Sequence, residues 1–282
     1  EIAQKLLVPT ALSDHGLASE PITFDDETLH VLIGNYTNEA GTAELDDIIR
    51  RVIRAVLVAR NLGVTTPPAA IRAEHLPHFA GRALAYRRRD QHPPPRGVTA
   101  ALVVDDHGGR HGIVSAVLMP TLGGSLFIEG RAHITFVDTD GADVTQRLSA
   151  VVAAVRSRLS DLDVPARFMQ EFSIRGHLPA TTLVGDEAST GLAAAIAIVS
   201  LARDRPIDPE LAATGSVAID GGVNPTLGIS HKMMAAHRAG ARRVLLPRGN
   251  EHDLDELPAQ IHDDMTFIPV DDIAQAVQVA LR

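Results

Sequence analysis

Residues 86–97 divide the sequence into two parts with different patterns. This stretch is rich in arginine and proline and has few apolar residues, which is typical of an interdomain linker. Before it, apolar residues recur at helical spacing; after it, short β-prone runs alternate with helical segments. We therefore predict a helical domain over residues 1–85, a linker over 86–97 and a mixed domain over 98–282, an α+β fold class overall.

The periodic segments predict the individual elements. In the first part we expect helices over residues 25–36, 45–57 and 67–79. In the second part we expect strands over residues 98–104, 113–119, 126–129, 134–137, 172–178, 217–219, 244–246 and 267–270. Helices are expected there over residues 144–159, 190–203, 232–239 and 273–281, of which 190–203 is almost entirely apolar.

The composition excludes several classes of site. The chain has no cysteine, which excludes disulfides, thiol nucleophiles and Cys-based metal centres. It has no phosphate-binding Gly-Lys-Ser/Thr loop, and its 13 histidines form no zinc-type pair backed by a glutamate, so we expect neither a cofactor nor a metal. A net charge of −9 makes nucleic acid an unfavourable partner, although the run from Arg87 to Arg89 is basic. The longest apolar run is about half a membrane span, and with no secretory signal the expectation is a cytoplasmic protein with no membrane partner.

One lysine stands out among the basic residues. Of 26 lysines and arginines, only Lys5 and Lys232 are lysines. Lys232 begins a predicted helix whose next residues are apolar, where burial would lower the pKa of its amine. A neutral amine can take the proton of a serine hydroxyl, whereas arginine stays protonated. The alternative is an ordinary surface lysine whose stem packs along the helix.

Ser189 is a candidate nucleophile because it directly precedes the apolar helix. The free N–H groups at a helix start can stabilise an oxyanion, and the backbone N–H of Ser189 is the expected donor. The alternative is that Ser189 is only an N-cap, the usual role of a serine at this place.

Four motifs occur in order around these two residues. They are Ile174-Arg-Gly-His177-Leu-Pro179, then Asp186-Glu-Ala-Ser189-Thr-Gly191, then Thr214-Gly215, and finally Pro225-Thr-Leu-Gly-Ile-Ser-His-Lys232-Met-Met-Ala-Ala-His-Arg-Ala-Gly240. They resemble the proteolytic domain of Lon proteases, which are Ser-Lys peptidases. The family forms of the second and fourth motifs are Asp-Gly-Pro-Ser-Ala-Gly and Pro-x-Gly-Gly-x-Lys-Glu-Lys, so Glu187 and Ala188 stand in place of Gly-Pro.

The resemblance assigns roles to individual residues. It implies Ser189 as the nucleophile and Lys232 as the general base, with Thr214 orienting the amine. Asp186 either orders the loop or pairs with Lys232 and holds it charged and inactive. His177, on the strand before the nucleophile loop, is expected to have a supporting role.

The first part resembles the small helical subdomain of the family's AAA+ ATPase module. Residues 7–9 and 36–41 carry its motifs in order, which would place the large nucleotide-binding subdomain upstream of residue 1. Ala43 stands where ATP-dependent members carry a nucleotide-sensing arginine, so the resemblance points to the ATP-independent Lon-like proteases. Residues 131–141 look like an insertion.

Two functions follow from this resemblance. The first is a serine endopeptidase that degrades unfolded or misfolded proteins inside the chamber of a homohexameric ring, without ATP. The second is a non-proteolytic Lon-like ring scaffold, associated with nucleic acid or regulatory. The scaffold needs neither Ser189 nor Lys232, and the presence of both favours the protease.

Overall fold

The computed structural model describes most of the chain. The described residues are 2–18, 22–37, 42–63, 70–83, 96–105, 108–120, 134–138, 141, 143–166, 168, 172–179, 186 and 188–281. They form two compact units, Glu1–Arg89 and Asp90–Arg282. The predicted linker lies outside the described residues except for its last two positions, and so does the predicted strand 126–129.

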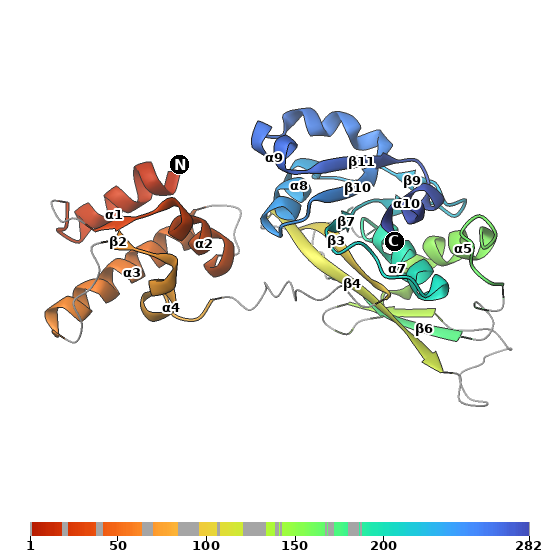
Figure 1. Cartoon of the computed structure of the whole chain (residues 1–282), viewed down its shortest axis with the longest axis horizontal. Helices are drawn as coiled ribbons and strands as arrows, with labels where there is room; N and C mark the ends of the chain where they lie inside the picture. The colour runs from red at the N-terminus through yellow and green to blue at the C-terminus, as the bar shows by residue number, and fades with distance from the viewer. Residues whose placement is uncertain are drawn as a thin grey trace. The chain divides into compact units, whose positions relative to one another are not determined.

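The first unit is mainly helical, as expected (Figure 1). Its elements are η1 (Ala3–Leu7), α1 (Val8–Asp14), α2 (Asp26–Tyr36), α3 (Ala43–Asn61), η2 (Ala73–His75) and α4 (Leu76–Phe79). A two-stranded parallel sheet joins β1 (Thr23–Phe24) to β2 (Ala70–Ile71). Part of the segment 67–79 is therefore a strand instead of the predicted helix.

Local signals account for the two longest helices of this unit. The side chain of Asp25 caps α2 by accepting the N–H of Thr28, which satisfies one of the free donors of the first turn. In α3 one face is buried, namely Leu45, Ile48, Ile49, Val52, Ile53 and Val56. The predictions for residues 25–36 and 45–57 are confirmed.

The second unit is built on a seven-stranded mixed sheet in the order β11-β10-β7-β3-β4-β6-β5. The strands are β3 (Val98–Asp105), β4 (Gly108–Pro120), β5 (Ile134–Val137), β6 (Phe172–His177), β7 (Leu211–Ala213), β10 (Arg243–Pro247) and β11 (Thr266–Val270). The first four in this order are parallel, β4 is antiparallel to both neighbours, and β5 is parallel to β6. Part of the suspected insertion 131–141 therefore forms the edge strand β5.

The remaining elements in the described part of this unit are helical, apart from one small sheet. The helices are η3 (Thr145–Leu148), α5 (Ser149–Ser157), α7 (Gly191–Arg203), α8 (Ile229–Arg238), η4 (Arg248–Glu256), α9 (Ala259–Asp264) and α10 (Ile273–Ala280). The small sheet pairs β8 (Ser216–Val217) with β9 (Val223–Asn224). Within the part of the chain that is described, no helix has both the length and the hydropathy needed to span a bilayer.

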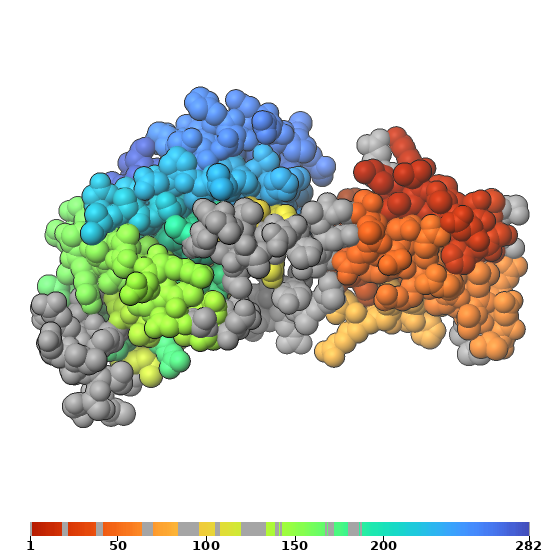
Figure 2. Space-filling view, turned by 180° about the vertical axis from the view of Figure 1, so that it is seen from behind, coloured from red at the N-terminus to blue at the C-terminus, as the bar shows by residue number. Residues whose placement is uncertain are grey.

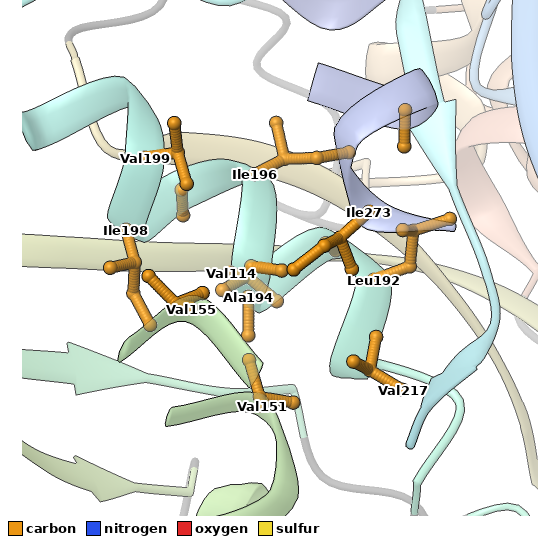
Figure 3. Packing of buried hydrophobic residues seen from close by; sticks show 14 of the residues in the cluster. Val114, Val151, Val155, Leu192, Ala194, Ile196, Ile198, Val199, Val217 and Ile273 are labelled. Carbon is orange, nitrogen blue, oxygen red and sulfur yellow. The ribbon is translucent and has the colours of Figure 1, made fainter. Parts of the chain in front are cut away.

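Helix α7 is the centre of the larger core, as its composition suggests. Ten of its residues are buried, and it packs against α5, α10 and one face of the sheet (Figure 3). Burial of an apolar helix on all sides contributes roughly 25 cal/mol for each Å² of apolar surface removed from water. The first residue of this rigid helix directly follows the Ser189–Thr190 turn.

Helix α8 packs in a separate core that includes Leu102 of β3 and Val244 of β10. It begins at Ile229, one turn earlier than predicted, because Gly228 adopts a positive φ of 66° and forms the N-cap. Seen from behind, the green segments before α7 and the blue C-terminal segments occupy different regions of the surface of this unit (Figure 2). Since α7 packs in the larger core and α8 in the separate one, the segments that carry Ser189 and Lys232 adjoin different cores.

Candidate active site

Ser189 lies in the turn that precedes α7, and its side chain is buried. The residue is 1% exposed, and its Oγ donates to Oδ2 of Asp186 at 3.0 Å. The N-cap of α7 is Thr190, which makes no side-chain capping bond. The alternative that Ser189 is only a helix cap is therefore wrong.

Lys232 lies in the first turn of α8 and is fully buried. Its Nζ donates to Oδ1 of Asp186 at 2.6 Å and to Oγ1 of Thr226 at 3.1 Å. Burial lowers the pKa of Lys232 below the usual lysine range, and the negative charge of Asp186 opposes this effect only in part. The alternative of an exposed lysine is wrong.

Asp186 links the two candidate catalytic side chains. Its carboxylate is buried and also accepts the N–H of Val104, at 3.0 Å to Oδ2. One carboxylate therefore binds the hydroxyl of Ser189, the amine of Lys232 and the end of β3. Of the two roles considered for Asp186, the structure contains the pairing with Lys232, while most of the loop before Ser189 lies outside the described residues.

The backbone N–H of Ser189 is occupied in this arrangement. It donates to the carbonyl oxygen of Asp186 at 3.0 Å, which closes the turn before α7. An N–H engaged in this way does not bind an oxyanion at the same time. The predicted oxyanion donor is thus present at the helix start, but this turn has to open before it can act.

The two residues with predicted supporting roles lie on or beside strands of the large sheet, His177 on the strand where it was expected. Thr214 is fully buried just after β7, and its Oγ1 donates to the carbonyl of Leu102 at 3.2 Å. His177 ends β6, opposite Ser115 of β4. Among the described residues, neither side chain is a hydrogen-bond partner of the Lys232 amine. The predicted contact between Thr214 and the amine is replaced by one from Thr226.

A pocket of about 330 Å³ opens beside Ser189. The described residues that line it carry no charge: they are Ala188, Ser189, Ser216, Pro225, Thr226 and Leu227. Leu227 is 55% exposed, which makes it an apolar side chain at the mouth of the pocket. The sequence motif that contains Thr226 and Leu227 assigns a role to Lys232 alone, so it does not predict these two residues as part of the site.

Comparison with known proteins identifies the family. Residues 70–282 match the model of the Lon protease (S16) C-terminal proteolytic domain. The chain belongs to the Lon protease family. Residues 13–64 match the Lon protease AAA+ ATPase lid domain, so a helical Lon lid is followed by a Lon proteolytic domain and the predicted fold class is confirmed.

Curated Lon proteases are similar in sequence to this chain along nearly its whole length. The Lon protease of Dictyoglomus thermophilum is 30% identical over 280 residues, covering 99% of this chain and 34% of that protein. The Lon protease of Chloroflexus aurantiacus is 32% identical over 284 residues, covering 100% of this chain and 33% of that protein. The chain thus spans about a third of the length of the curated relatives it matches.

The described residues contain no cluster of metal-ligating side chains. Within the described ranges, no group of three or more histidine, aspartate or glutamate side chains is arranged to hold a metal ion.

Proposed function

We propose that the chain is a serine endopeptidase in which Ser189 is the nucleophile and Lys232 is the general base. The observation that carries this proposal is that the buried amine of Lys232 and the buried hydroxyl of Ser189 both donate hydrogen bonds to the carboxylate of Asp186. A buried lysine, whose pKa is lowered by burial, is better suited to accept a proton than an exposed lysine is. Membership of the Lon family supports the same chemistry.

The reaction requires that Asp186 first leave the space between the two side chains. The neutral amine of Lys232 then takes the proton from Oγ of Ser189 while Oγ forms a bond to the scissile carbonyl carbon. The freed backbone N–H of Ser189 stabilises the oxyanion, a contribution of about 3 kcal/mol for one such donor. Lys232 gives its proton to the leaving amine. It then takes a proton from water as the water attacks the acyl carbon, and it returns that proton to Oγ of Ser189 as the acyl bond breaks.

We further propose that the described arrangement is a resting state. Asp186 occupies the hydroxyl of Ser189 and the amine of Lys232 with its side chain, and the N–H of Ser189 with its carbonyl oxygen. All three groups that the reaction needs are thus engaged by one residue. Binding of an extended polypeptide at the pocket would supply the energy to open the turn.

The proposed substrates are unfolded or misfolded proteins, cleaved in the cytoplasm within a homohexameric ring whose sites face an enclosed chamber. ATP is not required in this proposal, because Ala43 at the first position of α3 has no side chain able to contact a phosphate. These assignments rest on the resemblance to ATP-independent Lon-like proteases.

The proposal is tested by casein degradation with and without ATP. We expect cleavage by the wild-type chain at equal rates in both conditions, and none by Ser189→Ala or Lys232→Arg. Cleavage by either variant would refute the assigned chemistry, and stimulation by ATP would refute ATP independence. Reaction of Ser189 with a peptide boronate, read by mass, distinguishes a protease from a non-proteolytic scaffold.

The pH dependence gives a second test of the base. Since the amine must be neutral to accept a proton, the rate is expected to rise from neutral to mildly alkaline pH. A flat rate between pH 5 and about 9 would contradict the role of Lys232.

A further inference from the structure

The amine of Lys232 has a second partner that the family motif does not assign. Thr226 lies in the short segment between β9 and α8, and its Oγ1 accepts a hydrogen bond from Nζ of Lys232 at 3.1 Å. The hydroxyl comes from a residue that also lines the pocket beside Ser189. Thr226 therefore contacts the amine from the side of the pocket.

The backbone of Thr226 is held at both ends by one side chain. Asn250 of η4 accepts the N–H of Thr226 through Oδ1 at 2.9 Å and donates to its carbonyl through Nδ2 at 3.0 Å. Nδ2 also donates to Asp253 at 2.6 Å. Because an ionised carboxylate only accepts hydrogen bonds, Asp253 fixes which end of the amide faces it, and hence fixes both bonds to Thr226.

Packing supports these hydrogen bonds. Gly249, the residue before Asn250, approaches Pro225 so closely that a Cβ on it would lie 2.6 Å from Cγ of the proline ring. Asn250 is only 5% exposed, so its amide has little competition from water. The segment that carries Thr226 is thus bound to η4 by side-chain, backbone and van der Waals contacts.

We infer that Thr226, held in place by Asn250, is the positioning residue for the Lys232 amine during proton transfer. When Asp186 leaves, Thr226 remains as the hydrogen-bond acceptor for one N–H of the amine. That bond fixes the rotation of the amine so that its lone pair can face Oγ of Ser189. The proton moves from Ser189 to Lys232 and on to the leaving amine, and the hydroxyl of Thr226 accepts the same N–H throughout.

The positioning role of Thr226 can be tested by titration of the Lys232 amine, because few charged groups surround that amine among the described residues. Among the described residues, Asp186 is the charged group that contacts the amine. On the packed elements, Asp253 of η4 contacts Asn250, and Arg238 of α8 contacts the carbonyl of Gly109. A hydroxyl acceptor stabilises an ammonium more than an amine, so loss of the Thr226 hydroxyl should lower the pKa of Lys232.

The experiment exploits the two lysines of the chain. Isotope labelling of lysine gives two side-chain signals, and Lys5→Arg assigns them. Thr226→Val removes the acceptor and keeps the shape, and Thr226→Ser keeps the acceptor. We expect the Lys232 signal to titrate at lower pH in Thr226→Val and to return toward the wild-type midpoint in Thr226→Ser, with Lys5 unchanged in both.

Peptide cleavage provides the kinetic readout, and here the inference rests on the proposed function. Thr226→Val should lower kcat about ten- to a hundredfold with little change in KM, and Thr226→Ser should restore it. An unchanged Lys232 titration or an unchanged kcat in Thr226→Val would overturn the inference, as would failure of Thr226→Ser to restore activity. If Ser189→Ala cleaved peptides as fast as the wild type, the proposed function would be overturned instead. The titration would still show whether Thr226 is hydrogen-bonded to the Lys232 amine.

A second variant tests the part played by Asn250. Asn250→Asp keeps the acceptor for the N–H of Thr226 but loses both donated bonds and repels Asp253. We expect kcat to fall with KM preserved, as for Thr226→Val. Wild-type kcat in Asn250→Asp would exclude Asn250 from the positioning of Thr226.

Discussion

Breaking the buried pair between Lys232 and Asp186 is expected to destabilise the second unit strongly, although the intact pair itself adds little net stability. The charged atoms are 2.6 Å apart and both side chains are fully buried. At an effective dielectric constant of about 20, two unit charges at this distance attract with about 6 kcal/mol. Dehydration of both groups offsets much of this attraction, so the pair contributes little net energy as long as it is intact.

Removing one partner of the pair should lower the free energy of unfolding by much more than the intact pair contributes to it. Lys232→Met keeps the apolar stem and leaves the Asp186 carboxylate with two donors, the N–H of Val104 and the hydroxyl of Ser189. Breaking a buried pair typically costs about 3–5 kcal/mol, and the two remaining donors favour the lower end. For a domain of this size, roughly 2–4 °C is lost for each kcal/mol, so we expect Tm to fall by about 6–12 °C.

Differential scanning calorimetry of the full chain measures this effect, because it can resolve the transitions of the two units. Lys5→Met is the matched control, since it removes the other lysine and lies in the first unit. The double variant Lys232→Met with Asp186→Asn should recover most of the loss, because no unpaired charge stays buried. A Tm of Lys232→Met within about 2 °C of wild type, or a double variant no more stable than the single one, would refute the buried pair.

Three further variants test the site and its supports. Asp186→Asn removes the charge that raises the pKa of Lys232, so the acid limb of the pH–rate profile should move to lower pH. Between the lowered pKa of folded Lys232 and the ordinary lysine pKa, the unfolded chain of this variant binds more protons than the folded chain. The free energy of unfolding should therefore rise with pH in that range, and a fall would contradict this. Gly109→Ala would bring a Cβ onto the carbonyl of His231 in α8 and should cost about 1–3 kcal/mol in calorimetry, whereas an unchanged Tm would disprove that contact. Leu227→Glu places a carboxylate at the mouth of the pocket and should shift cleavage toward peptides with a basic residue before the scissile bond; equal preference in matched fluorogenic peptides would exclude the pocket as the binding site for that residue.

Elements whose burial follows a local pattern could be predicted from the sequence. The buried stripe of α3 recurs at helical spacing, and α7 is apolar over more than three turns. The edge strand β5 was predicted at its observed bounds, because its β-prone residues stand between polar turns. In contrast, β7 has only three residues, and its place in the sheet depends on ladders to β3 and β10 that no local pattern shows.

The sequence by itself determined the family and the two principal candidates, Ser189 and Lys232, because these residues occur in ordered motifs with a characteristic spacing. The tertiary structure alone decided their partners. Asp186 and Lys232 are separated by 46 positions, yet they form a buried pair, while Thr214 bonds to β3 and Thr226 takes the expected place at the amine. Hydrogen bonds between distant segments depend on how the packing of the two cores places α7, α8 and β3 next to one another. A sequence motif specifies residue types and their spacing, but it does not specify which side-chain atoms are in contact.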